Sequence, residues 1–425
     1  MIKRSFFSLG KPGLKYLSIT DQGSGVKELS LPGEVRLLVK DCDVGAINLK
    51  VGTPVLTGQK VVLTDDPGCY VISTVTGTVS GISEYTGYMN QGYASISIDV
   101  SGEDQLDEAT LGGLKEPSFE AARDYLTSIP GKSDFSSFLK LDPPVNTVVV
   151  TCVDQDLLVS TNQQMVLSDI DGLIEGIEYL KQVCRIGRVM IAAPASLVPL
   201  VSKAGVEVKE VCDTYPNSLS GMIAKDVLGA GYMPSKSFEQ MGLGFISAEA
   251  VICLARIFGK GEIQVDKLIT VIGKDNVPVM VKARIGTPAG VVLDGVGINA
   301  SSGDRVVFGG PMTGTSIYSL DMPVLADTDA IMVQDQSQVI LSEDCQCVNC
   351  GECVRACPVK VPVNMLVRVL ASGLYEEAAD MYDLHSCIEC GLCNYVCVAR
   401  IPVFHHIMLG KHEFAQIKNA EGSNG

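Results

Sequence analysis

The sequence predicts a multidomain α/β protein, because its length and two changes of residue pattern divide it into distinct modules. The 425 residues are enough for two to four domains. The pattern changes after Pro143-Pro144 and again after Gly261, and nine of the 15 cysteines crowd into residues 345–397. We therefore expect five segments. They are a β module (residues 1–100), a connector (101–144), an α/β domain (145–260), a second β module (261–335) and a Cys-rich helical module (336–425).

Composition and charge exclude several classes of protein. The formal net charge of -16 and the isoelectric point near 4.7 argue against a nucleic-acid binder, which needs a basic face. Mean hydropathy is positive, but the longest nearly apolar stretch, residues 189–201, contains Pro194 and Pro199 and is shorter than the about 20 residues of a spanning helix. The start MIKRSFFSLGKPG lacks the pattern of a signal peptide. We expect a cytoplasmic protein, associated with a membrane only through partner subunits.

Short β-branched runs separated by Gly and Pro predict that residues 1–100 form a small all-β module. Residues 50–61 and 73–82 resemble the two halves of a lipoyl- or biotinyl-carrier barrel sandwich. The tip that would carry the prosthetic group, residues 73–77, has the sequence STVTG and contains no Lys. We therefore expect a structural module rather than a swinging arm.

A Rossmann-like parallel sheet is expected after the connector. Residues 146–153 and 188–193 are apolar runs of strand length, and residues 168–184 between them have apolar side chains at helical spacing. This order predicts a βαβ unit. A further helix is expected over residues 245–258. The runs KLITVIG, VPVMVKARIG, GVVLDGVGI and DRVVFGG then predict the strands of a β-grasp-like module.

Two runs of cysteines in the last module share one spacing, C-x2-C-x2-C-x3-C. In such runs the first three thiolates hold one [4Fe–4S] cluster and the fourth belongs to the other cluster. Gly351 and Gly391 allow the backbone to fold closely around the sulfurs. The rule assigns two complete ligand sets: Cys347, Cys350, Cys353 and Cys397 for the first cluster, and Cys387, Cys390, Cys393 and Cys357 for the second.

Zinc is the alternative metal, because it also takes four thiolates. A zinc site built from the two C-x2-C pairs would leave the third and fourth Cys of each run unexplained, so the spacing favours iron–sulfur clusters. The apolar spacing of residues 363–384 predicts helices packed around the clusters. Cys345 and the four His are expected to be bystanders or surface groups, and the six scattered Cys to be small core residues.

In this order the pieces resemble the C subunit of Rnf-type ferredoxin:NAD reductase complexes. The most specific motifs are ARIGTP (residues 283–288), FGGPMTG (residues 308–314) and the two Cys runs. Residues 148–166 are also similar to the A subunit of the sodium-pumping NADH:quinone reductase. The Rnf resemblance implies a barrel-sandwich module, a flavin- and NADH-binding α/β domain, a β-grasp domain of the ligand-binding (SLBB) type and a dicluster ferredoxin module.

The expected nucleotide site departs from the family pattern. The family's G-G-A-G-F-P-T loop is replaced here by LGGLKEPS, in which Gly112 and Gly113 remain. The family's acidic stretch after the first strand survives only as Asp154 and Asp156. The small residues that follow the two glycines in the family loop are missing here. This weighs against FMN and NADH binding, because phosphate needs several free backbone N–H groups that small residues leave open.

We therefore expect an iron–sulfur electron-transfer subunit of an oxidoreductase complex, not catalytic by itself, that relays single electrons through two [4Fe–4S] clusters. Its expected partners are other subunits of the complex, a flavoprotein, a ferredoxin or a flavodoxin. Two alternatives remain at this point. One is a self-sufficient FMN-dependent NADH dehydrogenase, and the other is a docking scaffold with structural clusters.

Overall fold

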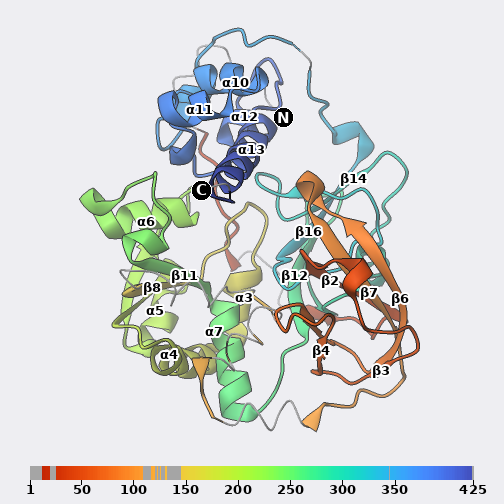
Figure 1. The fold of residues 1–425 in the computed structure, drawn as a ribbon. Helices are drawn as coiled ribbons and strands as arrows, with labels where there is room; N and C mark the ends of the chain where they lie inside the picture. Colours follow the sequence, from red (N-terminus) through yellow and green to blue (C-terminus); the bar gives the residue numbers. More distant parts are fainter. Residues whose placement is uncertain are drawn as a thin grey trace.

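A computed structural model gives the fold of the chain (Figure 1). It describes residues 12–19, 25–108, 116–119, 122, 125, 130–131, 145–343 and 345–423. Within these residues the strands form four sheets, and helices of the Cys-rich module cap one end of the molecule. The fold is therefore mixed α/β, as predicted.

The N-terminal module is built from antiparallel strands. A four-stranded sheet has the order β2 (Glu34–Lys40), β7 (Gly92–Val100), β6 (Gly77–Thr86) and β3 (Pro54–Val55), and a two-stranded sheet joins β4 (Lys60–Val62) to β5 (Tyr70–Ile72). Alternate side chains such as Val35, Ile96 and Ile98 fill the core. The tip of the predicted carrier module is buried, and the Thr74 hydroxyl donates to the carbonyl of Ile285. The tip thus packs against the second β module.

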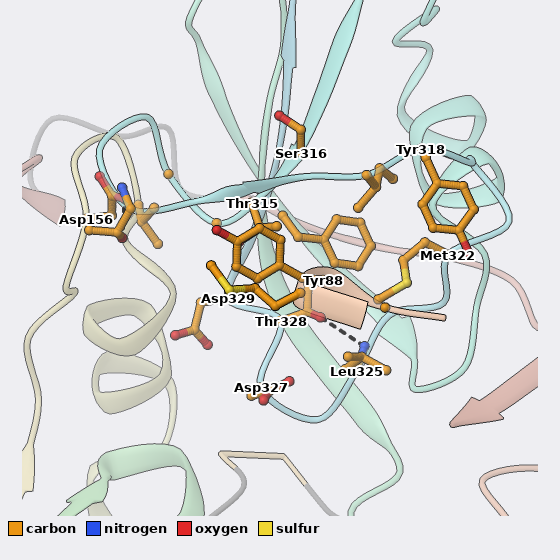
Figure 2. Close-up of a pocket in the computed structure, with 18 of the residues that line it drawn as sticks. Tyr88, Asp156, Thr315, Ser316, Tyr318, Met322, Leu325, Asp327, Thr328 and Asp329 are labelled. Atoms are coloured by element: carbon orange, nitrogen blue, oxygen red, sulfur yellow. Dashed lines mark hydrogen bonds between the residues drawn. The ribbon is translucent and has the colours of Figure 1, made fainter. Parts of the chain in front are cut away.

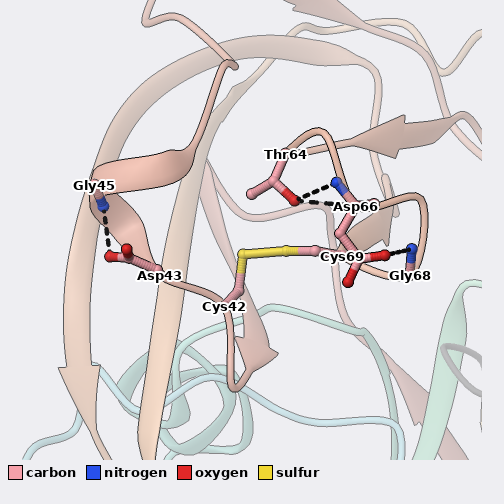
Figure 3. Close-up of a disulfide and its surroundings, with 7 residues drawn as sticks. All are labelled: Cys42, Asp43, Gly45, Thr64, Asp66, Gly68 and Cys69. Carbon is pink, nitrogen blue, oxygen red and sulfur yellow. Dashed lines mark hydrogen bonds between the residues drawn. A yellow bond between two sulfur atoms is a disulfide. The ribbon is translucent and has the colours of Figure 1, made fainter.

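Two expectations for the first hundred residues are wrong. Strand β1 (Val26–Glu28) pairs with β13 (Pro278–Arg284) of the second β module, so residues 1–100 are not one self-contained unit. Cys42 and Cys69 are not small core residues but form a disulfide within the N-terminal module (Figure 3). Asx turns at Asp43 and Asp66 lie beside the two cysteines. The two cysteines are 27 residues apart, and no local pattern signals their pairing.

A parallel sheet forms the centre of the α/β domain. Its order is β10 (Glu207–Val211), β9 (Arg188–Pro194), β8 (Thr147–Thr151) and β11 (Leu243–Ser247). Every residue of β8 is buried, as expected for a parallel strand covered on both faces. The helices of this domain are α3 (Thr161–Ser168), α4 (Ile170–Cys184), α5 (Val198–Val201), α6 (Ser220–Leu228) and α7 (Ala248–Ala255). The predicted βαβ unit is confirmed by the parallel pairing of β8 with β9.

The helix predicted over residues 245–258 begins later than expected. Residues up to Ser247 belong to β11, and the Ser247 hydroxyl accepts a hydrogen bond from the N–H of Ala250 at the start of α7. This cap ends the strand and starts the helix. A π-helical turn, Arg256–Lys260, follows α7.

The second β module contains a six-stranded sheet. Its order is β1, β13 (Pro278–Arg284), β12 (Asp266–Ile272), β16 (Ala330–Gln334), β14 (Arg305–Phe308) and β15 (Thr315–Ser316). The predicted strand GVVLDGVGI is wrong, because this segment forms helix α8 (Ala289–Val296). Pro288 precedes the helix and Gly297 ends it in the left-handed region, while Val292 and Leu293 pack into the core. In the fold this core packing outweighs the β propensity of the valines.

The Cys-rich module is helical and contains α9 (Glu352–Ala356), α10 (Val363–Ala371), α11 (Tyr375–Met381), α12 (Leu392–Tyr395) and α13 (Val403–Ser423). Leu366, Leu370 and Ile407 lie in its core. None of the described helices combines the length and the apolar character that a membrane crossing requires. Short 3-10 turns occur at Val44–Ala46, Tyr88–Asn90, Ser202–Ala204, Gly229–Gly231, Glu239–Met241, Gln336–Gln338 and Leu384–Ser386.

Candidate metal centre

The first predicted ligand set surrounds one small cavity. Its lining includes all four sulfur-bearing residues of the set, Cys347, Cys350, Cys353 and Cys397. Burial raises the pKa of Cys353 to about 11, and the neighbouring Cys350, Cys347 and Cys397 contribute to this rise. The last Cys of the second run therefore lines the same cavity as the first three of the first run.

The second predicted set is more deeply buried. Cys390 and Cys393 are each 7% exposed. Burial raises the pKa of Cys390 to about 12, and the nearby Cys387 and Cys357 contribute to this rise. Burial also raises the pKa of Cys387, with Cys357 again among its charged neighbours. Cys357 is thus a charged neighbour of both Cys387 and Cys390 of the second run.

The same backbone turn forms each site. Asn349 and Gly351 on either side of Cys350 have left-handed φ values, as do Glu389 and Gly391 on either side of Cys390. This turn curls the chain around the middle Cys of each run. Backbone N–H groups also point at sulfur: that of Val361 lies 3.4 Å from Cys357 Sγ and that of Glu389 3.5 Å from Cys387 Sγ. Such contacts stabilise thiolates.

The donor chemistry fits an iron–sulfur cluster, which four Cys thiolates hold. Across the described residues, no group of three or more His, Cys, Asp or Glu side chains is arranged to hold a single metal ion. A zinc ion draws its thiolates to about 2.3 Å from one point. The four Cys of the first set line one small cavity, and the spacing of the two runs is what favours a cluster over zinc.

The second site is enclosed by the other modules. The Tyr215 hydroxyl donates to the carbonyl of Cys390 at 2.6 Å. Gly391 packs so tightly against the carbonyl of Met312 that no side chain fits between them. Cys390, Tyr215 and Leu219 share a small hydrophobic cluster. The α/β domain and the second β module therefore both contact the second Cys run.

The first site lies nearer the surface. Val348 and Val398, which line its cavity, are 61% and 47% exposed. Arg355 Nη2 donates to the carbonyl of Cys350 at 2.9 Å and also pairs with Glu352.

At the second site the corresponding cation is Lys411. Its Nζ lies 2.6 Å from both the carbonyl of Cys387 and the carboxylate of Glu389. Sequence reasoning missed Lys411, because α13 brings it to the site from outside the Cys run.

Two of the residues predicted for a nucleotide site, Asp154 and Asp156, bind hydrogen-bond donors of the fold. Asp154 is buried and accepts hydrogen bonds from the N–H of Asn162 and the side chain of Gln163, at the start of α3. Burial raises the pKa of Asp154 to about 6. Asp156 accepts from the N–H groups of Met312 and Thr313 and from the Thr313 hydroxyl. Gly112 and Gly113 lie outside the described residues.

A larger cavity, about 660 Å³ in volume, lies beside Asp156 (Figure 2). Its walls come from three modules: the β6–β7 hairpin with Tyr88, the segment after β8 with Asp156, and the segment from β14 to β16 with Tyr318 and Asp327. Its lining, as far as the described residues form it, contains no Lys, Arg or His. Sequence reasoning missed this cavity, because its lining is collected from positions far apart in the chain.

Comparison with known proteins agrees with the metal chemistry. The model of the 4Fe-4S dicluster domain matches residues 346–401, which include both Cys runs. C subunits of ion-translocating oxidoreductase complexes match much of the chain. The relative from Pectobacterium carotovorum is 24% identical over 74% of this chain and 45% of its own length, and that from Pectobacterium atrosepticum is 24% identical over 84% and 54%.

The chain is similar to the C subunits of ion-translocating oxidoreductase complexes. This confirms the resemblance seen in the sequence. The chain spans about half of the length of the curated relatives that it matches. A NAD+-reducing [NiFe]-hydrogenase chain in the H2-reduced state superposes with a TM-score of 0.44 at 11% identity, covering 74% of this chain and 68% of that one.

Proposed function

We propose that this chain is an iron–sulfur electron-transfer subunit of an oxidoreductase complex, and that it relays single electrons through two [4Fe–4S] clusters. Cys347, Cys350, Cys353 and Cys397 would hold the first cluster, and Cys387, Cys390, Cys393 and Cys357 the second. The cavity that the four Cys of the first set line together, three from one run and one from the other, is the observation that carries this proposal.

The clusters supply one-electron chemistry, and the surrounding residues set where the electrons can pass. Tyr215, Met312 and Leu219 keep water and other proteins away from the second set. The exposed Val348 and Val398 leave the first set within reach of a partner protein. The first set would therefore hold the cluster that a partner protein can approach and the second set the more enclosed one, and each cluster would supply one-electron chemistry. The partner would be another subunit of the complex, a flavoprotein, a ferredoxin or a flavodoxin.

The modules would correspond to the family's arrangement. We infer a barrel-sandwich module from β2 to β7, a Rossmann-like domain from β8 to α7, a β-grasp domain from β12 to β16 and a dicluster ferredoxin from α9 to α13. The parallel order of β10, β9, β8 and β11 and the hairpin pairing of β12 with β13 support this division.

We further propose that the isolated chain binds neither FMN nor NADH tightly. The family pattern places Asp154 and Asp156 at the cofactor. In this fold the Asp154 carboxylate accepts a hydrogen bond from the start of α3, and the Asp156 carboxylate accepts one from the loop around Met312. The cavity beside Asp156 has no basic residue in its described lining to bind phosphate. The chain would then depend on a partner for its electrons.

The test is reduction of the anaerobically purified chain, followed by its visible absorbance and EPR spectrum. We expect dithionite to bleach the cluster absorbance and NADH to leave it unchanged. Stoichiometric FMN, or bleaching by NADH alone, would favour a self-sufficient NADH dehydrogenase. Clusters that dithionite cannot reduce would favour a scaffold with structural clusters.

A further inference from the structure

Residues 12–18, which we call the strap, lie across the α/β domain and reach the second Cys run. The strap pairs with the segment after β10. The N–H of Tyr16 donates to the carbonyl of Asp213 at 2.9 Å, and the N–H of Tyr215 donates to the carbonyl of Leu14 at 2.9 Å. The main chain of the strap is therefore fixed beside Tyr215, the residue that donates to the carbonyl of Cys390.

Buried donors of the α/β domain hold the strap at two further points. The side chain of Gln163 on α3 donates to the carbonyl of Leu17 at 3.1 Å, and the N–H of Ser218 donates to the Tyr16 hydroxyl at 3.2 Å. Gln163 and Ser218 are both buried. A buried donor that loses its partner is costly, so these contacts favour the closed position of the strap.

Exposure alternates along the strap. Gly13 and Lys15 are exposed, whereas Leu14 and Tyr16 are partly buried. This period of two is that of an extended chain with one face toward solvent and one toward the protein. Leu14 and Tyr16 therefore form the inner face of the strap.

The inner face of the strap packs beside the second Cys run. Leu14 and Tyr16 both contact the small hydrophobic cluster that contains Tyr215 and Cys390. The rings of Tyr16 and Tyr215 have their centroids 5.5 Å apart. Burial raises the pKa of the Tyr16 hydroxyl, and the charge of Cys390 contributes to this rise. The two strap side chains thus lie over the residues that cover Cys390.

We propose that the strap closes the second cluster to water and small solutes, with Leu14 and Tyr16 as its seal. This inference rests on the proposed function, since it requires a cluster at the second Cys set. Tyr16 is a positioning residue, because it acts through Tyr215. Opening of the strap then limits how fast iron can leave the second cluster, as local opening limits other reactions of buried groups.

Iron release tests this proposal on the full chain with its clusters loaded. The probe is the iron chelator bathophenanthroline disulfonate, added in excess under anaerobic conditions with dithionite. We expect a fast phase from the first cluster and a slow phase from the second. Tyr16→Ala and Leu14→Ala should each speed the slow phase by roughly tenfold and leave the fast phase unchanged. EPR of samples frozen during the reaction identifies the cluster that each phase removes.

Matched controls separate a seal from general stability. Tyr16→Phe keeps the ring and should keep the slow phase. Lys15→Gln removes an ion pair whose side chains are 70% and 59% exposed, so it should have no effect. Tyr179→Ala removes a ring that packs on Phe258 at 5.6 Å, nearly the distance between Tyr16 and Tyr215. It should lower the unfolding free energy without changing the slow phase.

Deuterium exchange gives a second readout that needs no variant. In D2O, pulsed EPR should show weaker deuteron couplings at the reduced second cluster than at the first. Equal couplings at the two clusters, release of all iron in one phase, or a slow phase unaffected by both Tyr16→Ala and Leu14→Ala would overturn the strap and leave the electron-transfer role intact. A chain that holds no cluster would instead overturn the proposed function, and the strap with it.

Discussion

The two Cys runs have nearly the same local structure but very different surroundings. Each has a left-handed residue on either side of its middle Cys, and each is predicted to give its last Cys to the other site. The first site lies beside the exposed Val348, whereas the second is covered by Tyr215 and Met312. Spacing along the chain therefore sets which sulfurs meet, while residues far away in the sequence set how much water and charge each site meets. The surroundings of each site, in turn, decide which proposed cluster a partner protein can reach.

The largest expected effect comes from breaking one crossover at a time. Cys357 belongs to the first run, but Cys357→Ser should remove or alter the second cluster. Cys397 belongs to the second run, and Cys397→Ser should remove or alter the first cluster. Each variant should retain about half of the iron. EPR of the reduced variants checks the assignment. If Cys357→Ser abolished the first signal instead, the crossover would be wrong.

The next largest effect comes from the difference in how tightly Gly391 and Gly351 are packed. Gly391 and Gly351 both have left-handed φ values, but a Cβ on Gly391 would run into the carbonyl of Met312, whereas one on Gly351 meets only the end of Arg355. We expect Gly391→Ala to destabilise the fold by about 3 kcal/mol or more, and Gly351→Ala by about 1 kcal/mol. Thermal or denaturant unfolding of the two loaded variants measures this difference. Equal losses would show that the second site is no more enclosed than the first.

A smaller effect concerns the potential of each cluster. Lys411 is 24% exposed and Arg355 49% exposed, so water screens the arginine more strongly. Lys411→Gln removes a positive charge that favours the reduced cluster and leaves Glu389 without this ion pair. We expect the second cluster to become harder to reduce by about 1 kcal/mol, on the order of 40 mV for one electron.

The matched control is Arg355→Gln, which should shift the first cluster by less. An EPR-monitored redox titration measures both, and the signal that moves in Lys411→Gln identifies the second cluster for the Cys variants. A shift of both signals by the same amount would contradict the assignment of Lys411 to one site.

The smallest effect comes from one hydrogen bond. Tyr215→Phe removes the donor to the carbonyl of Cys390 and should cost about 1 kcal/mol of unfolding free energy. Tyr395→Phe, at a 43% exposed position on α12, is the control and should have no measurable effect. Denaturant titration of the two variants tests whether the contact between domains stabilises the second site.

Regular patterns can be predicted from this sequence, whereas most contacts between modules cannot. The βαβ unit and the helices after the first Cys run follow from apolar periodicity, which is local information. The strand predicted in place of helix α8 is wrong, because the valines favour strands while the end signals at Pro288 and Gly297 are weak in sequence. The disulfide Cys42–Cys69 and the pairing of β1 with β13 depend on long-range folding and leave no local pattern.

For the candidate site, too, local patterns can be predicted from the sequence, whereas tertiary contacts cannot. Both Cys runs can be recognised directly from their spacing, and the four Cys predicted for the first cluster line one cavity. The family pattern predicts Asp154 and Asp156 near a cofactor, but their carboxylates cap α3 and bind the loop at Thr313. Which partner a carboxylate takes depends on tertiary contacts, so a residue type at a family position does not establish its role.

The most direct test of two complete cluster sites is the metal content of the anaerobically purified chain, combined with a reductive titration. Two thiolate sets predict about eight irons and eight acid-labile sulfides per chain, and uptake of about two electrons by two distinguishable centres. Zinc in place of iron, or only about four irons per chain with a single reducible centre, would contradict this assignment.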